Sequence, residues 1–327
     1  MLDAIPRVEL LAAPTPLERM ARIEAAIGHD GLWVKRDDVM SLGLGGNKTR
    51  SLEYWLGEAR AMDCDMLVVA GAPASNQCRL VAAAGAKAGI ETQVLYAGAE
   101  PQTLVGNALL TRLFGAWITW LGPMSEAERG RRAKQAFEEL RTQGRRPYLI
   151  GDPVVAALGY VRAAQELADQ ARHIDLRHVL LPGSMGPTEA GFIFGSAMID
   201  APWAIHLVSV EYPEDELRRR VAALLSELQA RTNLTPSSDP MARVRIDLSQ
   251  LGAGYGIATE ASVEASTMFA THEALVLEQT YVAKTFAALL RQVKQGSIKP
   301  GEAACVLHTG GVPSIFETHV GNPAASL

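Results

Sequence analysis

Segments typical of buried strands alternate with helix-like segments along most of this 327-residue chain. The apolar run 66–70 ends at Gly71, as expected for a strand that is buried on both faces. Residues 75–87 are rich in alanine, begin with capping residues and are followed by Gly89, which predicts a helix. Residues 92–96 have the pattern of the next strand. Repetition of this β-α-β unit predicts an α/β fold with parallel twisted sheets flanked by helices.

The alternation continues along the chain. We predict a helix at about 107–114, strands at 116–120 and 178–181, and another helix after the glycine-rich turn 183–188. Residues 231–241, rich in Pro, Ser, Asn and Asp, predict a loop. At about 150 residues per domain, the chain has room for two domains, or for one large domain with a smaller one embedded in it.

Composition and charge exclude several classes of protein. The formal net charge of -5 leaves no basic surplus for a phosphate backbone, so no nucleic-acid partner is expected. No apolar run approaches the ~18–20 residues of a membrane span, and the first residues lack a targeting pattern, so we expect a cytoplasmic protein without a membrane partner. Cys64, Cys78 and Cys305 are odd in number and scattered, which predicts neither a disulfide framework nor a metal site.

Residues 124–146 have the pattern of a charged helix with a basic cluster at Arg129, Arg131, Arg132 and Lys134. Such a cluster suits either an anion-binding patch or a solvated helix face, and we favour the solvated face.

A lysine among glycines is the first candidate for chemistry. Residues 43–50 (GLGGNKTR) contain Lys48 on a glycine-rich turn, where the backbone can come close to a ligand. A desolvated lysine has a lowered pKa, and its amine can form a Schiff base with a carbonyl cofactor. The spacing differs from that of a P-loop. An exposed loop lysine remains the alternative.

Two strand-to-helix turns carry candidate anion sites. Residues 70–77 bring Ser75, Asn76 and Gln77 to the positive end of a helix, where a carboxylate can bind, although a plain helix cap is equally consistent. Residues 183–191 (GSMGPTEAG) offer freed backbone amides and two hydroxyls that suit a phosphate. A Rossmann fingerprint is excluded by the order of the glycines. Together with Lys48, these turns suggest a phosphorylated carbonyl cofactor and a carboxylate substrate.

Three further positions lie toward the end of the chain. Tyr255 stands between two glycines and can turn into a cleft as an acid or hydrogen-bond donor, with a packed aromatic as the alternative. His308 lies in an apolar strand, which favours a structural histidine, and Thr309 offers a neutral hydroxyl beside two glycines.

Cys78, earlier in the chain, follows Asn76 in the first helical turn, and we interpret it as a packing residue.

Taken in order, these motifs resemble the D-cysteine desulfhydrase and 1-aminocyclopropane-1-carboxylate (ACC) deaminase family of pyridoxal 5′-phosphate (PLP) enzymes. The resemblance runs nearly end to end and rests on residues 14–18 (PTPLE), 35–38 (KRDD), 45–50 (GGNKTR), 75–77 (SNQ), 106–107 (GN), 254–256 (GYG) and 308–311 (HTGG). It implies PLP fold type II, the tryptophan-synthase-β-like fold, and a homodimer. We expect a small α/β domain at 52–161 inserted into a large cofactor-binding domain at 1–51 and 162–327, with the cofactor between the two.

The resemblance also implies roles for individual residues. Lys48 resembles the lysine that holds PLP and moves the α-proton, with Asn47 beside it at the cofactor. Asn76 would bond the O3′ of PLP, while Ser75 and the amides of Asn76 and Gln77 would receive the substrate carboxylate. The remaining positions are the phosphate turn of Gly183, Ser184, Met185, Gly186 and Thr188, the substrate-flanking Tyr255 and Tyr281, and Thr309 facing the pyridine nitrogen.

Three departures from the family pattern bear on the substrate. Val282 stands where ACC deaminases carry a glutamate, directly after the second tyrosine, which disfavours ACC ring opening. The phosphate turn is one residue longer than usual, with Met185 and Pro187 at flexible positions, and residues 151–156 lack a Gly-Gly-Ser-Asn stretch.

The expected reaction is α,β-elimination from a small amino acid to pyruvate and ammonia, with D-cysteine and release of sulfide preferred. Cysteate and ACC are the alternatives within the class. An amino-acid racemase and a PLP-binding protein without catalysis are the alternatives outside it.

Overall fold

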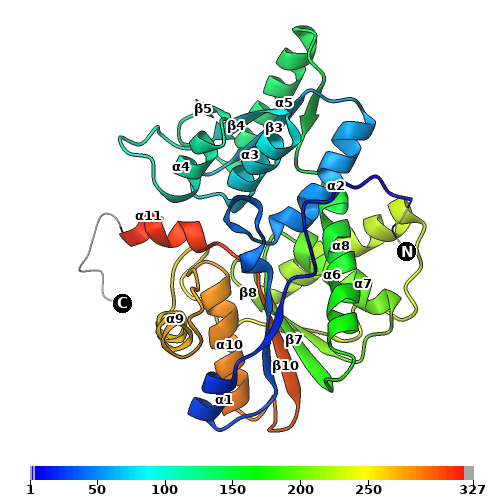
Figure 1. Cartoon of the computed structure of the whole chain (residues 1–327), viewed down its shortest axis with the longest axis vertical. Helices are drawn as coiled ribbons and strands as arrows, with labels where there is room; N and C mark the ends of the chain where they lie inside the picture. The colour runs from blue at the N-terminus through cyan, green and yellow to red at the C-terminus, as the bar shows by residue number, and fades with distance from the viewer. Residues whose placement is uncertain (1, 3, 320–327) are drawn as a thin grey trace. The chain divides into compact units, whose positions relative to one another are not determined.

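The computed structural model describes residues 2 and 4–319 and contains two compact units, each built on its own sheet (Figure 1). The first unit comprises the segment that ends at Ala12, Ser41–Asp152 and the segment that begins at Pro313; the second comprises Ala13–Met40 and Pro153–Val312. Both boundaries of the first unit's central segment precede those of the expected small domain, 52–161. The reason is packing, because helix α2 (Lys48–Ala61) contacts α3 whereas α6 (Pro153–Gln170) contacts α7.

The sheet of the first unit is parallel throughout, in the order β5-β4-β3-β6. Its central strand β3 is almost wholly buried, as the apolar run predicted, and Ser75 and Gly89 cap the following helix as expected. Helices α2, α3 and α4 form one layer, and α5 packs on β3 and β6. The elements not yet bounded are β3 (Met66–Gly71), α3 (Asn76–Ala88), β4 (Glu91–Tyr96), α4 (Gly106–Leu113), β5 (Trp117–Trp120), α5 (Glu126–Thr142), β6 (Pro147–Leu149) and α11 (Ile315–His319).

The second unit contains a six-stranded sheet in the order β1-β2-β10-β7-β8-β9. Only the pair β1 and β2 is antiparallel, so the strands from β2 to β9 all point the same way. Its strands are β1 (Leu17–Arg19), β2 (Leu32–Arg36), β7 (Leu176–Gly183), β8 (Ala204–Ser209), β9 (Val244–Asp247) and β10 (Ala303–His308). The loops that follow β7, β8 and β10 therefore lie at one edge of this sheet, where ligands of parallel α/β sheets bind.

Helices cover both faces of this sheet (Figure 1). Helices α1, α9 and α10 lie on one face, and α6, α7 and α8 lie on the other. The bounds not yet given are α1 (Ala21–Ile27), α7 (Pro187–Met198), α8 (Glu214–Thr232), α9 (Glu260–Glu273) and α10 (Val282–Lys294). Helix α8 extends two residues into the predicted loop at 231–241 and ends before its C-cap, the left-handed Asn233.

Helices α6 and α7 cross with almost no space between their backbones. A Cβ atom placed on Gly191 of α7 would lie 2.1 Å from the carbonyl oxygen of Ala157 on α6. A Cβ on Gly195, one turn later, would lie 2.5 Å from the carbonyl oxygen of Val161. Glycine is therefore required at both positions by the close approach of the two helices.

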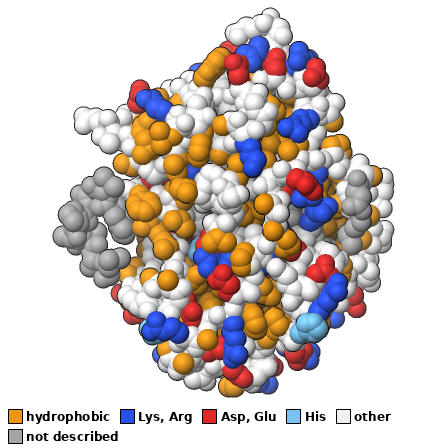
Figure 2. All heavy atoms as spheres, in the orientation of Figure 1, with side chains coloured by type: hydrophobic (Ala, Val, Ile, Leu, Met, Phe, Trp, Pro, Cys, Tyr) orange, Lys and Arg blue, Asp and Glu red, His pale blue; other side chains and the backbone are white. Residues whose placement is uncertain are grey.

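The charged helix α5 has the solvated face that the sequence analysis favoured. Arg131, Arg132 and Lys134 are exposed, and Arg129 and Arg131 pair with glutamates three residues earlier on the same helix. On the face drawn in Figure 2, acidic and basic side chains of the described residues lie interspersed. Across residues 2 and 4–319, none of the helices combines the length and the apolar character that a membrane crossing requires.

Two histidines are buried side by side near the amino ends of β7 and β8. Nδ1 of His178 lies 3.0 Å from Nε2 of His206, and Nε2 of His178 lies 3.3 Å from a carboxylate oxygen of Glu302. Burial, together with the neighbouring His178 and Arg245, lowers the pKa of His206 to about 4. Burial also lowers the pKa of His178, so both rings are neutral in the folded protein at pH 7.

This pair predicts acid sensitivity of the second unit. His206 has a folded pKa below the ~6.5 of an unfolded histidine, so below pH 6.5 the unfolded chain binds the extra proton and stability falls as the pH falls. Acidification from pH 7 to pH 5 should lower the free energy of unfolding by about 2 kcal/mol. Urea unfolding at the two pH values measures this loss. His206→Gln, which does not titrate, should show a smaller loss, and equal losses would contradict the assignment.

Candidate active site

Lys48 begins helix α2 after a turn rich in left-handed glycines. Gly43, Gly45 and Gly46 have φ angles of 51°, 70° and 118°, a region that favours glycine. Asn47 is the N-cap, and Lys48 itself is half-buried. The next two side chains, Thr49 and Arg50, are buried. The turn thus places Lys48 at the start of a helix that is anchored by the buried side chains of Thr49 and Arg50.

The second predicted turn of this unit caps helix α3. Ser75 is the N-cap, and its Oγ accepts a hydrogen bond of 3.2 Å from the N–H of Cys78. Asn76 and Gln77 follow in the first helical turn, whose N–H groups have no partners within the helix. The cap and the carboxylate site are compatible, because a serine Oγ has a proton left to donate. Cys78 is fully buried, as expected of a packing residue, and burial raises the pKa of its thiol to about 11.

One residue that the sequence analysis missed joins these two turns. Arg79 is fully buried in α3, and its guanidinium donates to the carbonyls of Gly43 and Gly45 and to Oδ1 of Asn76. Its position three residues after Asn76, inside an otherwise apolar helix, is the signal that could have revealed it.

In the second unit, the predicted phosphate turn lies between β7 and α7. Gly183 ends the strand, and Gly186, with φ of 104°, is the N-cap of α7. Ser184 and Thr188 are buried, whereas Met185 is exposed. The turn is held by two carboxylates: Glu189 accepts the N–H of Ser184 at 2.5 Å, and Glu211 accepts its hydroxyl at 2.5 Å. Neither glutamate was singled out from the sequence.

The two predicted tyrosines meet in the second unit. The hydroxyls of Tyr255 and Tyr281 are hydrogen-bonded, and their rings stand edge to face with centroids 5.7 Å apart. Burial and the adjacent Tyr255 raise the pKa of Tyr281 well above its usual value of 10. Both roles of a neutral phenol, donor and acceptor, are therefore available at pH 7. Lys284 is another residue that the sequence analysis missed. Its Nζ donates to the carbonyls of Leu251 and Gly254 at 3.4 Å each, and so holds the loop that carries Tyr255.

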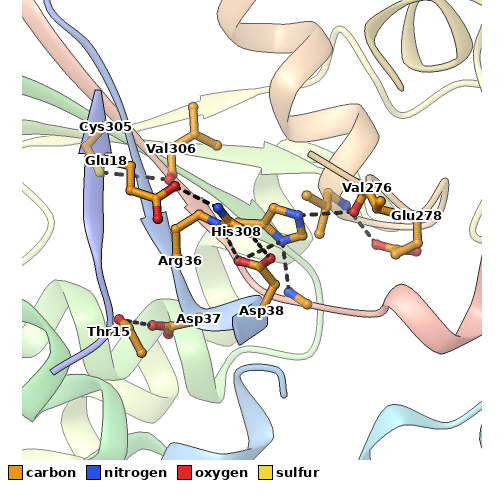
Figure 3. Close-up of polar contacts among 12 residues, drawn as sticks. Thr15, Glu18, Arg36, Asp37, Asp38, Val276, Glu278, Cys305, Val306 and His308 are labelled. Atoms are coloured by element: carbon orange, nitrogen blue, oxygen red, sulfur yellow. Dashed lines mark hydrogen bonds and ion pairs between the residues drawn. The ribbon is translucent and has the colours of Figure 1, made fainter. Parts of the chain in front are cut away.

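Thr309 directly follows β10, which ends at His308. Figure 3 shows the polar contacts of His308. His308 is fully buried; its Nε2 lies 3.1 Å from the carbonyl oxygen of Val276, and its Nδ1 accepts the N–H of Gly310 at 3.3 Å. Burial lowers the pKa of His308, so the ring is neutral and one nitrogen donates while the other accepts. The structural interpretation of His308 is thereby supported, and Thr309 is fixed between two anchored neighbours.

Helix α10 begins at Val282, directly after the second tyrosine, with a buried glutamate as its N-terminal partner. Glu278 accepts the N–H groups of Thr280, Tyr281 and Val282 at 2.7, 2.9 and 2.8 Å. The side chain of Val282 belongs to the apolar core. The carboxylate nearest to Tyr281 in sequence is therefore engaged in capping the helix.

The structure thus brings the predicted residues together in two groups. The first unit carries the Lys48 turn and residues 75–77, linked by Arg79. The second carries the turn 183–188, the tyrosine pair and Thr309, at the carboxyl edge of its sheet.

A comparison with protein families decides what these groups belong to. Residues 8–310 match the family model described as "Pyridoxal-phosphate dependent enzyme". The chain belongs to this family. It is a PLP-dependent enzyme of PLP fold type II, with lyases and deaminases among its relatives.

Individual relatives of this PLP-dependent enzyme span its whole length. A protein of Pyrococcus abyssi (strain GE5 / Orsay), named "Putative 1-aminocyclopropane-1-carboxylate deaminase", is 32% identical over 100% of this chain and 97% of its own. The D-cysteine desulfhydrase of Salmonella paratyphi B (strain ATCC BAA-1250 / SPB7) is 31% identical over 97% of this chain and 98% of its own. A crystal structure of an ACC deaminase homologue superposes with a TM-score of 0.86 at 28% identity, covering 97% of this chain and 95% of that one.

The described residues fit the chemical groups of PLP. A phosphate suits the N-terminus of the 12-residue helix α7, where the first N–H groups lack partners within the helix and Thr188 is the second helical residue. The left-handed Gly186 leaves backbone rather than a side chain at that turn. An aldehyde requires an amine such as that of Lys48, and a ring nitrogen can accept from the Thr309 hydroxyl. Pro187 lacks an N–H and Ser184 gives its own to Glu189, so the backbone nitrogens of these two residues are not donors to the phosphate.

Proposed function

We propose that this PLP-dependent enzyme is a lyase that converts a small β-substituted amino acid to pyruvate and ammonia, with D-cysteine as the preferred substrate. The balanced reaction consumes D-cysteine and one water and yields pyruvate, ammonia and hydrogen sulfide. Support comes from the family, from full-length relatives named for this activity or for ACC deamination, and from the two groups of site residues.

The observation that favours desulfhydration over ACC deamination is the environment of Val282. The resemblance places a glutamate at this position in ACC deaminases, whereas here the side chain is apolar and buried in the core. The neighbouring Glu278 does not replace it, because it accepts three backbone N–H groups. A neutral hydroxyl, Thr309, is then the group proposed to face the ring nitrogen. When bound, PLP draws electrons away from the substrate Cα, and a neutral partner for its nitrogen suits elimination rather than transamination.

The residues of the first unit would bind and deprotonate the substrate. Lys48 would hold the cofactor and carry the α-proton, with Asn47 beside it and Asn76 at O3′. Ser75 and the N–H groups of Asn76 and Gln77 would receive the substrate carboxylate, since the N-terminus of a 13-residue helix favours an anion.

The residues of the second unit would hold the phosphate and assist the leaving group. The turn of Gly183, Ser184, Met185, Gly186 and Thr188 is proposed for the phosphate. Tyr281 keeps its proton at pH 7 because its pKa is raised by burial. One hydroxyl of the pair Tyr255–Tyr281 can therefore donate its hydrogen bond to the departing sulfur. The other hydroxyl can then donate to the first, so the two tyrosines stay hydrogen-bonded.

A substrate panel with pyruvate as readout tests the proposal. D-cysteine should give the highest kcat/KM, above L-cysteine, cysteate and ACC. Sulfite release from cysteate, or pyruvate-free ammonia release from ACC, as the fastest reaction would move the assignment to one of those activities. Exchange of the α-proton without pyruvate from any β-substituted amino acid would instead indicate a racemase. Absorbance of bound PLP without turnover of any compound would indicate a silent binding protein.

We also propose that the two units are the two domains of each chain, and that the protein is a cytoplasmic homodimer. The resemblance to the family supports this assignment. Light scattering on the protein as it elutes from a size-exclusion column should give twice the mass of the 327-residue chain.

A further inference from the structure

Among the described residues of the first unit, Arg79 is the most deeply buried charged side chain. Its exposed fraction is 0%, although it sits on helix α3 among alanine and leucine. Burial lowers its pKa to about 10, an effect opposed by the charge of Glu317, so the guanidinium is still protonated at pH 7. Because a buried charge is costly unless its donors are satisfied, its partners define its role.

Two of these partners belong to the turn before Lys48. The guanidinium donates from Nη1 to the carbonyl of Gly43, and from Nη2 to the carbonyl of Gly45 at 3.0 Å. Both glycines are left-handed, and helix α2 starts at Lys48 directly after this turn. The planar fork of an arginine has a fixed geometry. The guanidinium therefore holds the two carbonyls at a fixed separation. Because α2 starts directly after this turn, its first residue is fixed in place as well.

The same side chain also reaches the other catalytic turn of the unit. Nη2 lies 3.4 Å from Oδ1 of Asn76, the residue proposed to bond the cofactor. Nε donates to Oδ1 of Asn107 at 2.7 Å, and Nδ2 of Asn107 donates to the carbonyl of Ala74 at 3.0 Å, next to Ser75. Arg79 and Asn107 thus connect the glycine-rich turn before Lys48 with the turn 74–76 through buried hydrogen bonds.

The C-terminal segment closes this network. The backbone N–H of Asn107 donates to Oε1 of Glu317 at 2.7 Å. A Cβ on Gly106 would lie 2.2 Å from the Glu317 side chain, so glycine is required for this approach. Asn107, itself fully buried, is therefore fixed from two sides before it meets Arg79.

We propose that Arg79 is a positioning residue that sets the place of the Lys48 amine relative to Asn76 and Ser75. Being fully buried, it acts through the Gly43–Gly45 carbonyls and Asn76 and touches neither substrate nor cofactor. This inference rests on the proposed roles of Lys48 and Asn76. The simplest alternative is that Arg79 only stabilises the fold of the first unit.

Arg79→Lys tests the proposal because it keeps a positive charge and loses the fork. A displacement of about 1 Å at reacting groups lowers rates by roughly 10²-fold, so we expect kcat per bound PLP to fall about 10- to 100-fold with little change in KM. The Kd of the apoenzyme for PLP, measured by fluorescence titration, should rise about tenfold. An unchanged kcat per bound PLP and an unchanged Kd would overturn the proposal.

Tyr148→Phe is the matched structural control. It removes another hydrogen bond of the first unit, 2.6 Å from the hydroxyl of the buried Tyr148 to a carboxylate oxygen of Glu58, which lies outside the Arg79 contacts given above. We expect a lower unfolding midpoint with unchanged Kd for PLP and unchanged kcat. A Tyr148→Phe enzyme with the same losses as Arg79→Lys would show that general destabilisation explains both, and would overturn the positioning role.

Asn107→Ser decides the matter if Arg79→Lys does not fold. It shortens the side chain that accepts from Nε and leaves the guanidinium in place. We therefore expect smaller losses in kcat per bound PLP and in affinity for PLP, and wild-type values would contradict the proposal.

Failure of the proposed role of Lys48 is recognised separately. Borohydride treatment of wild-type holoenzyme followed by peptide mass analysis must label Lys48; labelling elsewhere would overturn the role of Lys48 before any Arg79 variant is compared.

Discussion

Replacement of Lys48 by alanine should lower turnover by at least about 10³-fold, because one amine is proposed both to bind PLP covalently and to carry the substrate α-proton. The visible absorbance of the holoenzyme that borohydride bleaches should disappear as well. The fold should survive, since Lys48 is half-buried at the first position of α2 while the following Thr49 and Arg50 are buried. Stopped assays of pyruvate and an absorbance spectrum of the purified variant measure both effects.

Three other lysines make this prediction specific. Lys87→Ala, at an exposed position near the end of α3, should leave spectrum and turnover unchanged. Lys35 and Lys284 are buried, and they contact Glu166 and the carbonyls of Leu251 and Gly254 respectively. Persistence of the visible band in Lys48→Ala, or a borohydride-labelled peptide that contains Lys35 or Lys284, would remove Lys48 from the centre of the site.

The part of the site that the sequence predicted is the part formed by local backbone geometry. A glycine-flanked lysine, a Ser-Asn pair at a helix start and a Gly-Ser turn after a strand each signal their structure within ten residues or fewer. The residues that hold these turns were not predicted, because their partners are distant in sequence. Arg79 reaches back 34 residues to Gly45, and Glu211 reaches back 27 residues to Ser184. Such contacts exist only once the strands are ordered in the sheet.

The fold shows the same division between local and distant information. The unit β3-α3-β4 was predicted almost to its ends, because an apolar strand and a capped helix are encoded in adjacent residues. The insertion of β10 between β2 and β7 was not, since it joins segments from both ends of the chain. Strand β1, three residues long and mostly exposed, carries too little apolar pattern to be recognised. The domain boundaries depend on which helix α2 and α6 pack against, which is again a tertiary property.

The close crossing of α6 and α7 gives the largest expected effect on stability. Gly191→Ala would place Cβ 2.1 Å from the Ala157 carbonyl oxygen and 2.9 Å from Cβ of Tyr160. Alanine would otherwise favour the helix by about 1 kcal/mol, but a backbone carbonyl cannot move without separating the helices. Overpacking that forces backbone shifts typically costs about 1–3 kcal/mol, and we expect the upper end of this range because the clash is with a backbone carbonyl. We therefore expect a net loss, seen in calorimetry as a midpoint lower by several degrees.

Gly130→Ala on α5 is the matched control, because it makes the same chemical change in a helix with open space around the position. Only helix propensity acts there, so the midpoint should rise slightly, by the equivalent of up to about 1 kcal/mol. The opposite signs of the two substitutions separate steric overlap from propensity. Helix α7 also begins at the turn proposed for the phosphate, so Gly191→Ala should weaken PLP binding whereas Gly130→Ala should not. A Gly191→Ala protein as stable as the wild type would mean that the two backbones are farther apart than the structure has them.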